Sequence, residues 1–428
     1  MNRRWLDRFG FVTIVVAVFA IGILQGQLVF VLRFEIAAWA AVLVLAQAVF
    51  ASLTFTGFMI ATGVLLFWNM YRDQPSVETT DAGTITAIVP AYHDAPVMHR
   101  SVESLRESAY EDLSIVVVVE DEDSAGKQRA AELAAYDDVE YLVNEGYPGS
   151  KSGAINYAAE QVESEYLAVF DADEIVDPNF LPAGMSKMEA GAEVVQGRTV
   201  PEPDGLVESL AYAESVLLSY AARRFLYLFT DFRMAASRAV LLRRSALETV
   251  GGYDEDMLTE DFAFAYACYK SRIDVEEQLS YPSKIEAAHD IQDWWGQRKR
   301  WMTGYAQVLH RLVTSMRPID DYRNVLSPVL CATMMSGSLL LLSLLSKFTL
   351  LLFAGQELFF ALPIVVAIGL TIGFAYTDYT AGTISRIPPA LVLVPLILPF
   401  YSLAALKAIT EYVFTWQGDW YSVSKGVK

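Results

Sequence analysis

Two carboxylates one residue apart, Asp171 and Asp173, follow an apolar run over residues 166–170. A short apolar run predicts a buried strand, and open α/β sheets bind ligands beyond the carboxyl ends of such strands. Paired carboxylates suit Mg²⁺ or Mn²⁺, especially when substrate phosphates complete the coordination. An acidic chain also produces this spacing by chance, as in residues 121–123. We therefore predict a metal site at Asp171 and Asp173, and expect a substitution of Asp123 to have almost no effect.

The sequence around these carboxylates alternates between apolar strands and amphipathic helices. Strands are predicted over residues 84–89, 114–119, 139–143 and the run before Asp171, and helices over residues 97–108, 125–135 and 152–162. This alternation predicts an α/β fold with a mostly parallel sheet and helices on both faces. The loops after the strands would form its binding edge, and Tyr92, Glu120 and Asp121 lie in these loops.

Lys151 begins the predicted helix over residues 152–162. The preceding loop, residues 146–152, lacks the glycine spacing of a Walker phosphate loop. Lys151 and the free N–H groups of a helix start could still bind an anion. An ordinary capped helix with a solvated lysine explains the same residues.

Three helices are predicted beyond the sheet motifs. They cover residues 207–228, residues 243–252 with a glycine stop, and residues 262–269. Thr259, Glu260 and Asp261 precede the last of these, where a threonine cap and first-turn acids would explain them without any chemistry.

Residues 291–312 form a predicted helix that leads into an apolar stretch. Gln297 and Trp301 lie on one side of it with Trp294, and Arg300 lies beside them. Aromatic and arginine side chains at this place are also typical of an interfacial membrane anchor.

The composition indicates a membrane protein, because 54% of the residues are hydrophobic. Apolar stretches long enough to cross a bilayer occupy residues 11–32, 36–69, 326–353, 358–377 and 389–413. The first is too long for a cleaved signal peptide. Arg3, Arg4 and Arg8 precede it, so the positive-inside rule predicts a cytoplasmic N-terminus in a multi-pass protein of the cell membrane. Five crossings would place Lys428 outside.

These patterns predict four regions. They are two transmembrane segments in residues 1–72, a cytoplasmic α/β domain in residues 73–290, an interfacial helix region in residues 291–325, and about three segments in residues 326–428. All but six of the 51 acidic residues lie in residues 73–325. Such a negative domain argues against a nucleic-acid partner. The net charge of −19 and the scarcity of lysine suggest a halophilic source.

The ordered set of motifs resembles the family 2 glycosyltransferases, in particular the membrane-embedded branch with cellulose, chitin, hyaluronan and glucomannan synthases. The matching residues are Pro90-Ala-Tyr92, Glu120-Asp121, Lys151-Ser-Gly-Ala-Ile-Asn156, Asp171-Ala-Asp173, Arg243-Arg244 through Gly251-Gly252, Thr259-Glu260-Asp261 and Gln297-Arg-Lys-Arg300-Trp301. Two departures stand out. The family usually has Asp-Asp at Glu120-Asp121, and residues 233–237 lack the Cys-Gly that is frequent in processive synthases.

The resemblance implies a GT-A fold and an inverting transferase that uses a nucleotide diphosphate sugar, with a UDP-sugar favoured, and a glycan or lipid-linked acceptor. It implies a metal at Asp171 and Asp173 and a general base at Asp261, supported by Glu260. The nucleotide would contact the side chains of Tyr92, Asp121 or Glu120, Lys151 and Asn156. The diphosphate and the acceptor would contact Gln297, Arg300 and Trp301.

Three alternatives remain beside polysaccharide synthesis. A transferase could add one sugar to a polyprenyl phosphate or a lipid-linked glycan. A transporter should carry ionisable residues within its spans, where only Lys347 and Lys407 qualify. A non-catalytic membrane partner subunit would not need the complete set of expected catalytic side chains that this sequence has.

Overall fold

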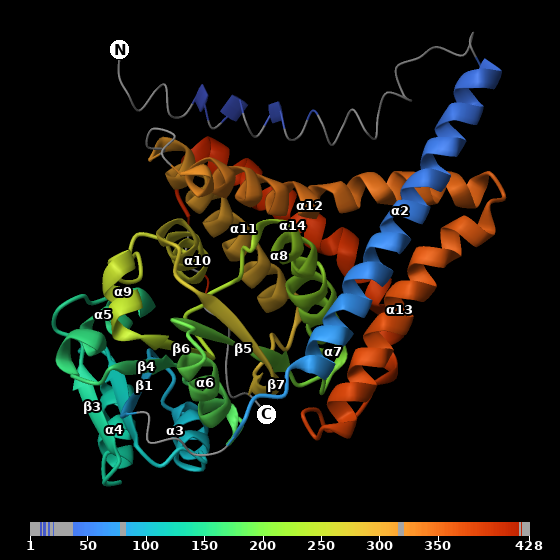
Figure 1. Cartoon of the computed structure of the whole chain (residues 1–428). Coiled ribbons are helices and arrows are strands. Elements are labelled where there is room, and N and C mark those ends of the chain that lie inside the picture. Colours follow the sequence, from blue (N-terminus) through green and yellow to red (C-terminus); the bar gives the residue numbers. More distant parts are fainter. Residues whose placement is uncertain are drawn as a thin grey trace. The chain divides into compact units, whose positions relative to one another are not determined.

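The computed structural model describes residues 37–77, 83–315, 321–418 and 421, together with a few positions between residues 9 and 20. The chain forms two compact units. Among the described residues, one unit contains those within 68–202 and 230–287, and the other contains those up to 67 and those within 203–229 and 288–421. We call them the sheet unit and the helical unit (Figure 1).

The described residues of the sheet unit form seven strands in the order β3-β2-β1-β4-β6-β5-β7. The strands are β1 (Ile85–Ala91), β2 (Leu113–Val119), β3 (Val139–Val143), β4 (Tyr166–Val169), β5 (Val194–Pro201), β6 (Val240–Arg243) and β7 (Val275–Ile285). Only β6 runs antiparallel to its neighbours, β4 and β5. The predicted mostly parallel sheet is therefore confirmed, and the carboxyl ends of β1, β2 and β4 share one edge.

Pro90 lies inside β1, whereas the predicted strand ended at residue 89. Its missing N–H is tolerated because β4 pairs only with residues 85–88 of β1. On the other side of β1, Pro90 is in register with Val118 of β2.

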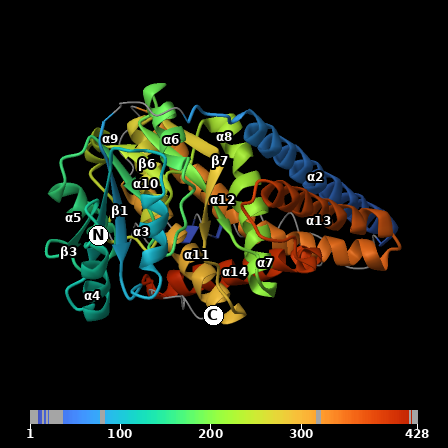
Figure 2. The ribbon, with the colours of Figure 1, turned by 90° about the horizontal axis from the view of Figure 1, so that it is seen from below.

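Helices cover both faces of this sheet (Figure 2). They are α3 (Met98–Arg106), α4 (Ser124–Leu133), α5 (Lys151–Gln161), α6 (Phe180–Glu189), α9 (Arg244–Val250) and α10 (Glu260–Ser271). Apolar side chains of α3, α4 and α6 pack with alternate residues of β1, including Ile85, Ala87 and Val89. The buried side chains of α5 belong to the opposite layer. Because side chains alternate between the two faces of a sheet, each strand directs half of its side chains to each helical layer.

The sequence did not predict β5, β6 and β7. Strand β5 carries buried polar residues, Gln196, Arg198 and Thr199, which interrupt the apolar pattern. Strand β6 has four residues, too few for a clear periodic signal. By contrast, the predicted glycine stop of α9 is confirmed, because Gly251 has a φ of +86°.

The helical unit holds the apolar helices and the tryptophan-rich helix. Its elements are α2 (Ala37–Arg72), α7 (Leu206–Glu214), η2 (Ser215–Ala221), α8 (Arg223–Thr230), α11 (Ile291–Thr314), α12 (Tyr322–Phe353), α13 (Glu357–Thr380), η3 (Pro389–Leu396) and α14 (Ile397–Thr415). The helix predicted over residues 207–228 is divided by the π-helical turn η2. Helices α2 and α8 run across the boundary between the units.

Four helices in the described part of the chain are long and apolar enough to cross a membrane. They span residues 41–72, 322–353, 357–380 and 389–415. Side chains of α2 and α13 pack closely, since the Phe67 and Phe374 rings stack 3.7 Å apart and Leu370 lies against Gly63. The crossing predicted over residues 11–32 lies outside the described residues, apart from isolated positions.

Candidate active site

Asp171 lies two residues beyond β4, between two cationic side chains. Its Oδ1 atom accepts a hydrogen bond from the Lys151 ammonium group, and its Oδ2 atom lies 3.7 Å from Nη1 of Arg238. The Asp171 N–H donates to Oε2 of Glu174 at 3.0 Å. Opposite charges at this distance stabilise the ionised carboxylate.

The other carboxylates of this turn are more deeply placed. Asp173 is 8% exposed and Glu174 is fully buried. Burial, with a further contribution from the charge of Asp171, raises the pKa of Glu174 to about 8. The buried Glu174 carboxyl also supports the Asp171 backbone by accepting the hydrogen bond from the Asp171 N–H.

Within the described residues, no cluster of three or more His, Cys, Asp or Glu side chains is arranged to hold a metal ion. Two carboxylates, Asp171 and Asp173, nevertheless fit a Mg²⁺ or Mn²⁺ ion that also takes oxygens from a substrate diphosphate, because such ions typically use one or two carboxylates. The donor set thus suits a metal that is bound together with phosphates.

Two adjacent residues connect this turn to the Thr259-Glu260-Asp261 triplet. Ser237 donates a hydrogen bond to Oε1 of Glu260 at 2.8 Å, while Arg238 faces Asp171. Both motifs that the sequence singled out for chemistry therefore lie against the segment formed by residues 236–239.

Glu260 and Asp261 occupy different environments at the start of α10. Glu260 is 8% exposed, and burial raises its pKa; the charge of Lys151 opposes this shift and that of Asp261 adds to it. Asp261 is half-buried, and its Oδ1 atom accepts from the N–H of Phe262 at 2.8 Å. Thr259 stands at the N-cap position, but its buried hydroxyl makes no hydrogen bond to a described residue. Side-chain capping therefore does not account for Thr259.

A hydrogen-bonded loop sets the position of Lys151. The Ser150 hydroxyl caps α5 by accepting from the N–H of Gly153. Glu120 is buried, and its two oxygens accept from Nδ2 of Asn144 at 2.8 Å and the N–H of Gly149 at 3.1 Å. Glu120 thus holds the loop that leads to Lys151, and Lys151 pairs with Asp171 instead of being the solvated lysine of the alternative interpretation.

Two of the predicted nucleotide contacts lie in accessible loops at the same sheet edge. Tyr92 follows β1 and is 50% exposed. The Asp121 side chain follows β2, is 81% exposed, and pairs with Lys127 at 2.8 Å. Both side chains can be reached by a ligand.

Asp123 is not the dispensable carboxylate that we expected. It is 2% exposed, it caps α4 by accepting from the N–H of Gly126, and it accepts from the N–H of His93 at 2.7 Å. Loss of a helix cap typically costs about 1 kcal/mol. A substitution at Asp123 would therefore affect the fold.

Asn156 has a structural partner. Its Nδ2 atom donates to the carbonyl oxygen of Tyr253 at 2.8 Å, and its Oδ1 atom accepts from the N–H of Tyr253 at 2.9 Å. These bonds tie α5 to the loop after α9. Contact between Asn156 and a nucleotide stays a prediction.

Gln297, Arg300 and Trp301 lie on α11, in the helical unit. The guanidinium group of Arg298 lies 4.6 Å from the centre of the Trp301 ring and also donates to Oε1 of Gln297. The motif pattern assigned no role to Arg298, although this residue lies between the motif residues.

A buried acid of α7 fixes Arg298. Nε of Arg298 lies 2.9 Å from both oxygens of Glu214, and Nε1 of Trp294 donates to Glu214 at 2.9 Å. Trp294 is 3% exposed, so it packs inside its unit rather than acting as a headgroup anchor. Breaking such a buried pair by removing one partner is strongly destabilising.

The C-terminal segment contacts the same helix. The Tyr421 hydroxyl donates to Oδ1 of Asp293 at 2.8 Å. A Cβ at position 296 would lie 2.4 Å from the Tyr421 ring, so glycine is required there for the ring to pack. Tyr421 thus lies at the end of α11 that follows β7.

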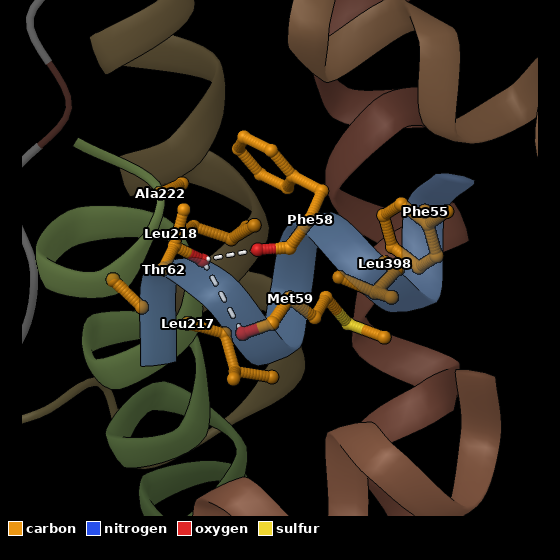
Figure 3. A pocket seen from close by; sticks show the side chains of 9 residues that line it. Phe55, Phe58, Met59, Thr62, Leu217, Leu218, Ala222 and Leu398 are labelled. Carbon is orange, nitrogen blue, oxygen red and sulfur yellow. Dashed lines mark hydrogen bonds between the residues drawn. The ribbon is translucent and has the colours of Figure 1, made fainter. Parts of the chain in front are cut away.

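An apolar hollow lies in the helical unit (Figure 3). Its lining comes from α2, the η2 region and α14, and is apolar except for Thr62, whose hydroxyl contacts the carbonyl oxygens of Phe58 and Met59. It offers no charged group for a nucleotide sugar, so the candidate active site is the edge near Asp171.

Part of the chain is similar to known proteins. The model of glycosyl transferase family 2 matches residues 86–251, which include the Asp171 turn and end before the Thr259-Glu260-Asp261 triplet. Poly-beta-1,6-N-acetyl-D-glucosamine synthase of Staphylococcus epidermidis is 21% identical over 233 residues, which cover 53% of this chain and 56% of that protein. Cellulose synthase 2 of Novacetimonas hansenii is 23% identical over 323 residues, or 72% of this chain and 20% of that protein. The chain thus spans little more than half the length of the first relative.

A solved structure shares the fold. The mannosyltransferase PcManGT from Pyrobaculum calidifontis, in complex with GDP-Man and Mn²⁺, aligns with a TM-score of 0.51 and 16% identity. The alignment covers 84% of this chain and 99% of that protein. The predicted α/β fold of GT-A type, flanked by long apolar helices, is confirmed by this likeness and by the strand order.

Proposed function

We propose that the chain transfers a sugar, with inversion, from a nucleotide diphosphate sugar to a glycan or lipid-linked acceptor at the membrane. Its residues 86–251 match glycosyl transferase family 2, and it is similar to a poly-beta-1,6-N-acetyl-D-glucosamine synthase and to a cellulose synthase. The observation that carries this proposal is the placement of Ser237 and Arg238, which contact Glu260 and Asp171. The turn at Asp171, which would stabilise the charge of a leaving diphosphate, therefore lies next to Glu260 and Asp261, the pair of acids that would act on an acceptor hydroxyl.

The residues around Asp171 would bind the donor. The ammonium of Lys151 and the guanidinium of Arg238 provide positive charge for a diphosphate. Asp171 and Asp173 would hold a divalent cation, which supplies Lewis-acid stabilisation of the leaving diphosphate when it is bound. Tyr92 offers an aromatic face and Asp121 an exposed carboxylate for the nucleoside.

Asp261 would take the proton from the acceptor hydroxyl. An alcohol is a poor nucleophile at neutral pH, so a displacement in one step needs a base close to it. Asp261 is half-buried and accessible, whereas Glu260 is buried against Ser237. Glu260 therefore supports the site, and Asp261 is the residue that the acceptor can reach.

A panel of labelled nucleotide sugars tests the proposal. Purified full-length protein in lipid bilayers would be incubated with UDP-, GDP- and other nucleotide diphosphate sugars, and the label would be measured in lipid and polymer fractions. We expect at least one donor to transfer its label to an acceptor fraction. UDP-sugars are the donors that we expect first. Label in the polymer fraction would assign chain synthesis, and label in the lipid fraction alone would assign addition of a single sugar. A panel without any transfer would reject the proposal in favour of a non-catalytic partner subunit.

The membrane topology gives a separate prediction. We expect residues 73–325 to face the cytoplasm, where nucleotide sugars are available. A cysteine at Ser124, which is exposed on α4, should resist an impermeant thiol reagent in intact cells and react after lysis. A cysteine replacing Gln417 should behave in the same way, because Tyr421 contacts Asp293 and therefore lies on the side of α11. We thus expect the C-terminal segment on the cytoplasmic side, whereas five crossings would place it outside. Labelling of the Ser124 site in intact cells would reject the topology.

Conservative substitutions in α11 separate substrate binding from membrane anchoring. We expect Arg300→Lys and Trp301→Phe each to lower kcat/KM by roughly tenfold or more, since lysine loses the planar fork of donors and phenylalanine has a smaller π face. An anchor would tolerate both changes. Arg311→Lys, on an exposed position of the same helix, is the matched control and should keep wild-type turnover. Wild-type kcat/KM in both motif variants would assign α11 an anchoring role only.

A further inference from the structure

Both carboxylate oxygens of Asp171 are next to a positive charge. Lys151 pairs with Oδ1, and Nη1 of Arg238 lies 3.7 Å from Oδ2. The side chains of Asp171, Lys151 and Arg238 are only 23%, 22% and 31% exposed. Salt therefore screens these charges less than it would screen charges on an open surface.

The proposed metal ligand, Asp171, thus has two positive charges beside it, and both would repel a cation. A divalent ion at Asp171 would meet two positive groups within the roughly 4–6 Å over which single charges shift each other's equilibria strongly. A diphosphate brings negative charge and oxygen atoms, which are the natural partners of guanidinium and ammonium groups. The same two cations therefore oppose a bare metal ion and favour a phosphate.

Hydrogen bonds fix the backbone around Arg238. Nε2 of the buried Gln196 donates to the carbonyl oxygens of Arg238 and Ala239 at 3.0 and 3.2 Å, and its Oε1 accepts from the N–H of Ala236 at 2.5 Å. The Tyr253 hydroxyl donates to the carbonyl oxygen of Ala236 at 2.9 Å. Ala239 has a φ of +43°, a conformation that persists only where the surroundings enforce it.

The backbone of this segment is therefore fixed, and Arg238 can change partner only by moving its side chain. The Lys151 side chain begins at the first residue of α5, whose start is capped by Ser150. Both cations thus extend from fixed backbone positions to the carboxylate of Asp171.

We propose that Lys151 and Arg238 hold the two oxygens of Asp171 until the donor arrives and then move to its diphosphate, so that the divalent cation and the nucleotide sugar bind as a pair. This inference rests on the proposed function. It adds Arg238 to the donor-binding residues and assigns the two cations control over when Asp171 accepts a metal.

Mn²⁺ binding without any nucleotide tests the proposal. The full-length protein would be titrated with Mn²⁺ alone, and free Mn²⁺ would be followed by electron paramagnetic resonance. We expect Arg238→Gln and Lys151→Gln each to bind Mn²⁺ about tenfold more tightly than wild type, the change that one lost positive charge nearby commonly produces. Arg238→Lys keeps the charge and should bind Mn²⁺ as wild type does. Arg243→Gln is the control for lost charge, because Arg243 pairs with Glu165.

The same variants should respond to nucleotides in the opposite direction. With saturating Mn²⁺, binding of UDP or GDP should weaken about tenfold in Arg238→Gln and Lys151→Gln. A variant that was merely misfolded would weaken both metal and nucleotide binding. Unchanged or weaker Mn²⁺ binding in both glutamine variants would overturn the exchange.

Asp171→Asn separates this inference from the proposed function. If Asp171→Asn abolishes Mn²⁺ binding while the glutamine variants leave it unchanged, the exchange is wrong and the metal site stands. If Asp171→Asn binds Mn²⁺ like wild type, the metal site lies elsewhere and the exchange falls with it. Sugar transfer by the wild-type protein would still support the proposed transferase in either case.

Discussion

An Asp261→Asn variant is expected to bind its nucleotide sugar with nearly wild-type affinity and to transfer the sugar about 10² to 10⁴ times more slowly, the usual contribution of a general base. Asparagine keeps the size of the side chain and its acceptor oxygen for the Phe262 N–H, but it cannot take a proton. Donor affinity should change little, because the proposed base would contact the acceptor and not the donor. Binding would be measured by titration with the donor found in the panel, and transfer by single-turnover kinetics.

The alternative for Asp261 is a favourable charge in the first turn of a helix, which contributes roughly 1 kcal/mol or less to stability. That role predicts a small loss of stability and turnover within a few-fold of wild type. Glu248→Gln, which neutralises an exposed acid on α9, is the matched control and should be silent in both assays. Nearly normal turnover in Asp261→Asn with intact donor binding would move the base elsewhere, and Glu260 would be the next candidate.

An Asp173→Asn variant is expected to lose roughly 10² to 10³ in kcat, comparable to removing one group that stabilises the charge of a transition state. The change removes a negative charge from a side chain that is 8% exposed and adjoins the Asp171 turn. A chelator should inactivate the wild-type protein, and added Mg²⁺ or Mn²⁺ should restore it. Turnover at several metal concentrations would show whether the variant needs more metal or turns over more slowly at saturation.

Asp137→Asn is the appropriate control, since Asp137 is exposed in the turn that follows α4. Asp123 cannot serve, because it caps α4 and binds the His93 N–H. Full activity of Asp173→Asn in the presence of a chelator would end the metal hypothesis. The transferase itself would then act with Lys151 and Arg238 as its charge-stabilising groups.

The first half of the sheet and one of its edges could be predicted because the physical signals there are local. Strands β1 to β4 are short apolar runs separated by amphipathic helices, so the alternation alone places their loops on a common edge. The glycine stop at Gly251 and the long apolar helices are equally local signals. Strand β5 was missed because Gln196 and Arg198 are buried polar residues in a strand, which periodicity does not anticipate.

The partners within the site could not be predicted, because they come from contacts between distant segments. Nothing in the acidic residues 120–123 distinguishes the buried Glu120 and Asp123 from the exposed Asp121. Arg238 can be recognised as a candidate site residue only from the structure, because the pairing of β6 with β4 brings it to Asp171. Glu174 and Arg298 do have a sequence signal, since each adjoins or interrupts a recognised motif.

The stereochemistry of the new glycosidic bond tests the central claim most directly. The donor from the panel has a known anomeric configuration, and the configuration of the first transferred sugar would be determined by nuclear magnetic resonance on product from the purified wild-type protein. A direct displacement assisted by Asp261 predicts the inverted configuration. A product that keeps the configuration of the donor would contradict the assignment of Asp261 as the base of a single displacement at the Asp171 edge.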